Sequence, residues 1–170
     1  AMPRGSGKTT LTTVACVWAM LNGHRQFVCL IAASAERARS LLANMKTWFE
    51  TNELLVEDFP EVVYPIRKLG RITNRQLGQT YRGEPTRLEW TADKIVLPTI
   101  PGSKASGAVI TTSGMKGSEI RGQNHALADG TIIRPQLAVI DDPQTTESAW
   151  SLTQSKQRES ILASDILGMA

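Results

Sequence analysis

The first fifty residues alternate between helix-like and strand-like spacing of apolar positions. Five apolar residues with a helical period predict a first helix that stops at Asn22-Gly23: Leu11, Val14, Ala15, Trp18 and Leu21. Residues 27–33 form a continuous apolar run, which is typical of a strand buried on both faces. Ser34 then begins a second helix, whose apolar stripe we expect in the core: Ala38, Leu41, Leu42, Met45, Trp48 and Phe49.

The rest of the chain has shorter elements. Pro60 and Pro65 interrupt residues 51–83, where the apolar residues lose their period, and a short helix followed by a loop is predicted. Residues 87–91 and 94–97 predict a hairpin. Further elements are predicted as follows: a strand at 107–112, a glycine-rich polar loop at 113–130, a short buried strand at 137–140 and a helix at about 147–167. Long helices that alternate with buried strands indicate an α/β fold with a mainly parallel sheet flanked by helices.

Composition places the chain among ordinary globular domains. Of its 170 residues, 41% are apolar and 21% are charged, which excludes disordered, collagen-like and disulfide-rich classes. No apolar run approaches the roughly 18 residues that cross a bilayer, and the first residues are unlike a signal peptide, so we expect an intracellular protein. Cys16 and Cys29 have no metal-type spacing and are expected to be buried apolar side chains in a reducing compartment.

Charge changes this picture in one segment. The formal net charge of +3 permits a nucleic-acid partner without requiring one. Residues 62–83, however, contain no acid and five basic residues: Arg67, Lys68, Arg71, Arg75 and Arg82. Two interpretations stay open for this segment, a solvated loop face and a patch that contacts phosphates.

The strongest candidate chemistry lies in residues 2–9, which match the phosphate-binding pattern G-x-x-x-x-G-K-S/T except that Met2 occupies the first glycine position. Gly5 and Gly7 allow backbone angles that point successive N–H groups at phosphate oxygens. Lys8 is expected to contact the β- and γ-phosphates of ATP, and Thr9 to offer its hydroxyl to Mg²⁺. The residues expected to bind the nucleotide are Arg4, Gly5, Ser6, Gly7, Lys8, Thr9 and Thr10.

Arg4 allows two interpretations. Its guanidinium lies within the loop, where it could reach the γ-phosphate and stabilise the charge that develops there, as an arginine finger does. Alternatively, it points outward and pairs with an acid. The residues alone leave both open.

A second motif follows at residues 137–142, where four apolar residues precede Asp141 and Asp142. In a phosphoryl-transfer site the first acid holds Mg²⁺ and the second orients or deprotonates the attacking water. By itself, Asp-Asp-Pro after a strand is also a good turn sequence. Together the two motifs predict a P-loop NTPase of the RecA/ASCE-like kind that uses ATP and Mg²⁺, because both motifs belong at the carboxyl edge of one parallel sheet.

Residues 3–9, 117–122 and 137–145, together with Glu147, Ser148 and Ala149, resemble the ATPase domain of the large terminase subunit of tailed bacteriophages. The resemblance implies an ATP-hydrolysing motor in the cytoplasm of the bacterial host that drives double-stranded DNA into a procapsid. It implies a homo-oligomeric ring, with the portal protein and the small terminase subunit as partners and no membrane. It also favours a catalytic role for Arg4, and places the segment Ile120-Arg121-Gly122 near the nucleotide or DNA.

The chain departs from this family in several places. Many terminases have Asp-Glu where this chain has Asp141 and Asp142. The Asp142 side chain is shorter than that glutamate, which puts its role as the base in question. The strand before the P-loop, the coupling motif and the C-terminal nuclease domain have no counterpart in residues 1–170. We therefore expect a partial P-loop ATPase domain, incomplete at both ends and marginally stable by itself, with nuclease activity only in a full-length protein.

Two other classes of function stay open. A helicase-like or other DNA-dependent P-loop ATPase would share both motifs. A nucleotide-binding assembly module without turnover would keep the P-loop and lack an active second acid.

Overall fold

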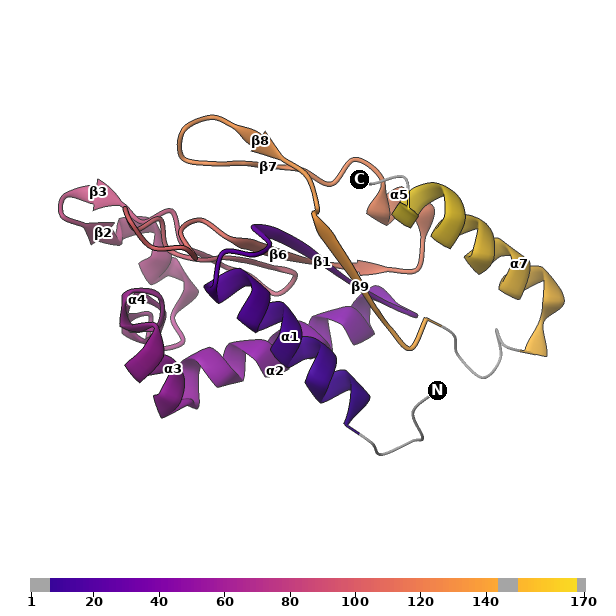
Figure 1. The fold of residues 1–170 in the computed structure, drawn as a ribbon, viewed down its shortest axis with the longest axis horizontal. Coiled ribbons are helices and arrows are strands. Elements are labelled where there is room, and N and C mark those ends of the chain that lie inside the picture. Colours follow the sequence, from indigo (N-terminus) through magenta and orange to yellow (C-terminus); the bar gives the residue numbers. More distant parts are fainter. Residues whose placement is uncertain (1–6, 144–149, 168–170) are drawn as a thin grey trace.

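The computed structural model describes residues 7–143 and 150–167 (Figure 1). The N-terminal half contains α1 (Lys8–Leu21), β1 (Phe27–Ala32), α2 (Ala35–Thr51), α3 (Glu53–Asp58), α4 (Pro60–Lys68) and the 3₁₀-helix η1 (Thr73–Gly78). Short strands follow: β2 (Thr80–Tyr81), β3 (Glu84–Pro85), β4 (Glu89–Trp90) and β5 (Lys94–Val96). The C-terminal half contains β6 (Val109–Gly114), α5 (Gly117–Ile120), β7 (His125–Ala126), β8 (Ile132–Ile133), β9 (Leu137–Asp141), α7 (Leu152–Ile161) and the π-helix η2 (Leu162–Ile166).

One five-stranded sheet organises the fold, in the order β4-β5-β6-β1-β9. β1 lies parallel to both β6 and β9, whereas β5 runs antiparallel to β6 and β4 antiparallel to β5. The α/β class with a mixed, mostly parallel sheet is therefore confirmed. The predicted hairpin is confirmed as well, by the pairing of Trp90 with Ile95.

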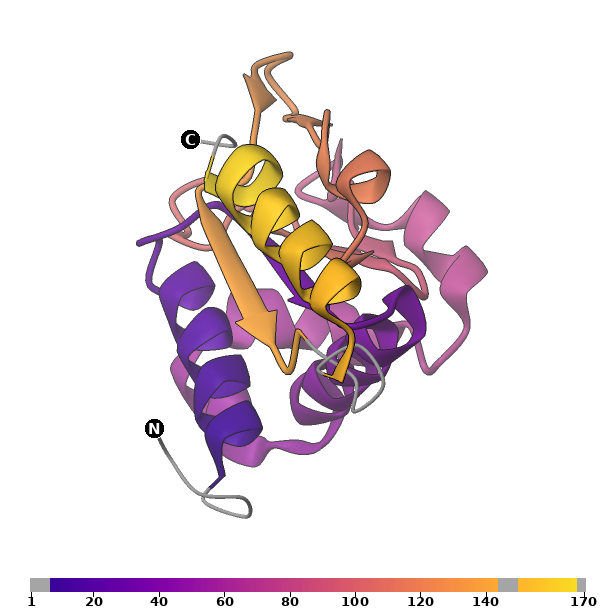
Figure 2. The same ribbon diagram turned by 90° about the vertical axis from the view of Figure 1, so that its right-hand side faces the viewer.

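Helices cover both faces of the sheet (Figures 1 and 2). Val28 and Leu30 of β1 pack in one core cluster with residues of α1 and α2. Cys29 and Ile31 point to the opposite face, in a smaller cluster with residues of α5 and η2. All six residues of β1 are buried, which confirms the prediction from its continuous apolar run.

The prediction of α1 is correct, although most of the apolar residues on which it depends lie on the exposed side of the helix. The residues used to predict it include Leu11, Val14 and Trp18, which are 62%, 47% and 58% exposed. The side of α1 that packs on the sheet contains Cys16, Val17, Met20 and Leu21, together with buried Thr13 and Ala19. α1 is apolar around much of its circumference, so helical spacing alone does not identify the face that meets the sheet.

α2 follows its prediction closely. The Ser34 side chain accepts a hydrogen bond from the backbone N–H of Arg37, and so caps the helix as expected. The predicted stripe is buried except for Trp48, which is partly buried: Ala38, Leu41, Leu42, Met45 and Phe49.

Residues 51–83 contain more regular structure than predicted. The segment forms α3, α4, η1 and the first strand of the β2–β3 hairpin, where a single short helix and a loop were expected. Pro60 opens α4 instead of breaking it, because the first turn of a helix does not need the missing N–H. Pro65 lies inside α4, which ends three residues later at Lys68.

The C-terminal elements also differ from their predictions. β9 is half-buried, whereas a buried strand was expected, and it pairs with β1 alone among the described residues. The predicted loop at 113–130 contains α5 and β7. The predicted helix at about 147–167 is observed as α7 and η2, and its first residues lie outside the described part.

Both cysteines are buried, as expected from the sequence. Burial raises the pKa of the Cys16 and Cys29 thiols to about 11, so both remain protonated at neutral pH.

Among the described residues, no helix combines the length and apolar character that crossing a bilayer requires.

A close approach at the end of β6 gives a test of the fold. A Cβ atom at Gly114 would lie 2.9 Å from the backbone nitrogen of Ala35 and 2.9 Å from Glu119 Oε2. We expect Gly114→Ala to lower the free energy of unfolding by about 1–3 kcal/mol, measured by urea denaturation, because the backbone at the start of α2 must shift and the Glu119 carboxylate must leave its place.

Gly78→Ala is the matched control. Gly78 has no atom within 4 Å of an added Cβ and does not have a positive φ, so its substitution should change stability by less than about 0.5 kcal/mol. Equal effects of the two substitutions would contradict the observed packing at the end of β6.

Candidate functional site

The end of the phosphate-binding motif forms the start of α1. Gly7 is the N-cap and has φ 73°, in the left-handed region that favours glycine. Lys8, Thr9 and Thr10 follow in the first turn, where the direction of the backbone N–H groups and the helix dipole favour an anion. The other residues expected to bind the nucleotide, Arg4, Gly5 and Ser6, lie outside the described part of the chain, as does Met2.

The two predicted motifs meet at Thr9 and Asp141. The Thr9 hydroxyl donates a hydrogen bond to the Asp141 carboxylate, with Oγ1 3.0 Å from Oδ1 and 3.2 Å from Oδ2. These residues are 132 positions apart in the sequence. The fold therefore joins the N-terminal motif to the end of β9.

The period of the strand explains why Asp141 faces α1. Leu137 and Val139 of β9 pack in the core cluster that contains α1, whereas Ala138 and Ile140 pack in the cluster on the opposite face. Because side chains alternate along a strand, Asp141 follows Leu137 and Val139 to the α1 face. Asp141 also pairs with Ala32, the last residue of β1, and so lies at the carboxyl edge of the parallel strands.

The second acid of the motif is held by a different partner. Asp142 has φ 43°, which is unusual for a residue other than glycine. Backbone angles of this kind are common at functional sites. Its Oδ2 lies 3.0 Å from Nη2 of Arg37, and both side chains are more than half exposed. The first turn of α2 thus contacts the end of β9.

Arg37 was not identified from the sequence. One signal was present, since a cation in the first turn of a helix is unfavourable with the helix dipole and benefits from a nearby carboxylate. Arg37 and Asp142 are 105 positions apart, so no local sequence pattern shows that they pair.

The donor types at this edge suit Mg²⁺ and a phosphate. A carboxylate and a hydroxyl oxygen, close enough to share a hydrogen bond, match the oxygen ligands that Mg²⁺ prefers in nucleotide sites. The N-terminus of α1 and the ammonium group of Lys8 supply positive charge for phosphate oxygens. Thr9 and Asp141 could therefore hold the metal.

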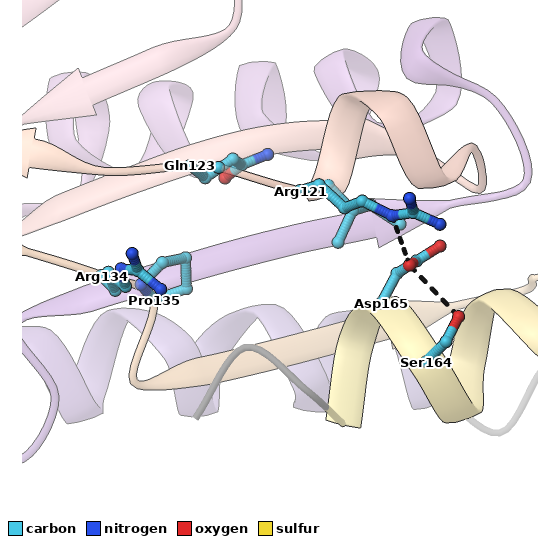
Figure 3. Close-up of a pocket in the computed structure, with 8 residues that line it drawn as sticks. Arg121, Gln123, Arg134, Pro135, Ser164 and Asp165 are labelled. Carbon is cyan, nitrogen blue, oxygen red and sulfur yellow. Dashed lines mark hydrogen bonds and ion pairs between the residues drawn. The ribbon is translucent and has the colours of Figure 1, made fainter.

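A separate cavity of about 350 Å³ lies beside α5 and η2 (Figure 3). Nε of Arg121 donates a hydrogen bond to Oδ1 of Asp165 at 2.6 Å, and the Ser164 hydroxyl lies 3.2 Å from the same oxygen. A Cβ at Gly117 would collide with the Asp165 carboxylate, so η2 packs directly on α5. Gln123 and Arg134 line the same space without reaching the ion pair (Figure 3).

This cavity has no lining residue in common with the Thr9–Asp141 site. The segment Ile120-Arg121-Gly122 lies at the end of α5, and β7 and β8 separate it from β9 along the chain. Within the described residues, however, the Arg121 guanidinium is engaged by Asp165 on the C-terminal segment. Its expected position near nucleotide or DNA stays a prediction.

Comparison of the chain with protein-family models, curated proteins and solved structures gives no match.

The Arg121–Asp165 ion pair predicts a pH dependence of stability. The hydrogen bond from Arg121 lowers the pKa of Asp165 below its ordinary value, so the pair stabilises the fold above that ordinary value and stops doing so as the pH falls through the lowered one. We expect Arg121→Ala to be less stable than the wild type above about pH 5, and the difference to shrink below it. Urea unfolding between pH 2 and 7 measures this.

Arg134→Ala is the control, because Arg134 lines the same cavity and forms no ion pair with a described residue. Its effect on stability should not vary with pH. A difference between wild type and Arg121→Ala that stays constant from pH 2 to 7 would show that the ion pair does not hold Asp165 ionised.

Proposed function

We propose that this protein is a P-loop ATPase that binds ATP with Mg²⁺ at the carboxyl edge of its sheet and hydrolyses it. The observation that carries the proposal is the hydrogen bond between Thr9 and Asp141. A coincidental glycine-rich turn and a coincidental Asp-Asp turn would have no reason to meet across 132 residues, whereas a metal–nucleotide site requires it.

Each residue of the site has a separate role in this proposal. Lys8 and the first turn of α1 bind the β- and γ-phosphates, and Thr9 and Asp141 hold the metal. When bound, Mg²⁺ neutralises charge on the phosphate oxygens. Asp142 orients the attacking water and accepts its proton, while Arg37 fixes the direction of the Asp142 carboxylate. Arg4, if it reaches the γ-phosphate, stabilises the charge that develops there.

For the biological role, we propose the motor of viral DNA packaging, a large terminase subunit. Support comes from the order and content of residues 3–9, 117–122 and 137–145, which resemble that family's ATPase domain. The partners would be double-stranded DNA, the portal protein, the small terminase subunit and further copies in a ring, in the cytoplasm of a bacterial host.

A nucleotide-binding module without turnover is the second candidate, and the ion pair between Arg37 and Asp142 is the observation that favours it. A carboxylate that stays paired with a guanidinium is not free to contact the attacking water. ATP turnover by the unmodified protein separates this candidate from the first.

Two substitutions test the proposed roles separately. Lys8→Ala should weaken ATP binding by at least tenfold, because it removes the cation that contacts the phosphates. Asp142→Asn should leave ATP affinity within about threefold of wild type and lower kcat by at least a hundredfold, because the amide cannot accept the proton. Isothermal titration with ATP and a phosphate-release assay measure the two effects.

Thr12→Ala is a matched control on α1, because the Thr12 hydroxyl donates a hydrogen bond to the backbone oxygen of Lys8 within the helix itself. It should leave both quantities near wild type. If Lys8→Ala binds and turns over ATP normally, the P-loop assignment is wrong. If Asp142→Asn keeps its kcat, Asp142 is not the catalytic carboxylate.

A further inference from the structure

We propose that Lys68, Arg75, Arg82 and Arg87 form a surface, called here the hairpin surface, that binds the phosphate backbone of double-stranded DNA. This inference rests on the DNA-dependent role proposed above and names where the duplex is held. The surface lies at the end of the molecule that contains α4, η1 and the β2–β3 hairpin, apart from the start of α1 (Figure 1).

The structure separates the basic residues of this region into two groups. Arg67 pairs with Glu53 at 2.9 Å and Arg71 pairs with Glu50 at 3.2 Å, so the charges of these two arginines are balanced within the protein. Two of the five cations of residues 62–83 therefore contribute little to an attractive surface.

The other cations remain available. Lys68, Arg75 and Arg82 are exposed and form no ion pair within the described part of the chain, and neither does Arg87, which follows β3. Glu84 is the acid of the β2–β3 hairpin, and the nearby Glu89 is balanced by Lys94 at 3.0 Å. Residues 60–87 thus hold these four cations without an ion pair to a described residue, against two acids, Glu61 and Glu84, which leaves an excess of two positive charges.

Contacts within the region bring these cations onto one structure. Arg75 in η1 has Nη1 3.5 Å from the Leu69 carbonyl oxygen, which ties η1 to the end of α4. Arg87 and Gln76 of η1 line one hollow of about 360 Å³. Gln79 donates a hydrogen bond to the Pro65 carbonyl oxygen, which links the start of the hairpin to α4.

The backbone at the arginines is a second, independent observation. Arg82 has φ 52° and Gly83 has φ 89°, so both residues of the hairpin loop are left-handed, as in a type I′ turn. Arg87 also has φ 52°. Glycine or asparagine adopts these angles more easily, so arginine at both positions has a backbone cost.

Two cations of the region lie over tyrosine rings. Nζ of Lys68 lies 4.9 Å from the centre of the Tyr64 ring, and the guanidinium of Arg82 lies 5.3 Å from that of Tyr81. Proteins that bind single strands stack unpaired bases on aromatic rings, whereas here each ring has a cation over one face. The cations themselves suit a phosphate backbone, which needs no unpaired base.

The test uses the unusual backbone at Arg82 and Arg87. Arg82→Asn and Arg87→Asn remove the charge while placing a residue that tolerates a left-handed conformation, so folding should not suffer. Binding of a fluorescent DNA duplex is measured by anisotropy across a salt series, without nucleotide. In the double variant the slope of log K against log salt should become less steep by about 2, and affinity near 0.1 M salt should fall by roughly 50-fold.

Arg39→Ala is the matched control, an exposed arginine of α2 without an ion pair to a described residue. It should leave the slope unchanged. An unchanged slope in the double variant, an equal loss in Arg39→Ala, or a loss confined to single-stranded DNA would each overturn the assignment of the hairpin surface to duplex DNA.

ATP binding distinguishes this inference from the proposed function. If the wild type binds ATP but no duplex, the hairpin surface is wrong and the ATPase proposal stands. If the duplex binds through Arg82 and Arg87 but ATP does not bind, the ATPase proposal fails and the surface stands.

Discussion

The site depends on the parallel pairing of β9 with β1. This register sets Asp141 beside Ala32 at the carboxyl edge of the sheet, and the alternation of side chains along β9 turns Asp141 toward α1. A slip of one residue would direct Asp141 to the opposite face and remove its contact with Thr9. The burial of Cys16, Val17 and Met20 against the sheet fixes α1 in the matching position.

α2 connects the two regions to which function is assigned. Arg37 in its first turn pairs with Asp142, and Glu50 near its last turn pairs with Arg71, close to the hairpin surface. The helix has 17 residues and is therefore about 26 Å long. The proposed ATP site and the proposed DNA surface thus lie on opposite ends of one well-packed helix.

Elements whose pattern of apolar residues fits only one arrangement were predictable from the sequence. The continuous apolar run of β1 and the capped stripe of α2 each allow a single arrangement, and both were found. The apolar face of α1 was not predictable, because apolar side chains surround that helix and only the sheet selects among them. Residues 51–83 were misread because Pro60 starts a helix as readily as it ends one.

The candidate site also has residues that were predictable from the sequence and residues that were not. Lys8 and Thr9 belong to one short motif, and Asp141 and Asp142 to another. Each motif is continuous in the sequence, so these candidate residues could be predicted from it. Arg37 escaped because its partner is distant in sequence, and Arg87 because it lies beyond the acid-free segment. Long-range pairing of charges is set by the fold, which no local pattern contains.

The most direct test of the shared metal site is a double-mutant cycle on the Mg²⁺-dependent gain in ATP affinity. The gain is measured by titration calorimetry with and without Mg²⁺ for the wild type, Thr9→Ala, Asp141→Asn and the double variant. If both residues hold one metal, each single variant loses most of the gain and the double variant loses little more. A full gain in Asp141→Asn, or losses that simply add, would contradict the account.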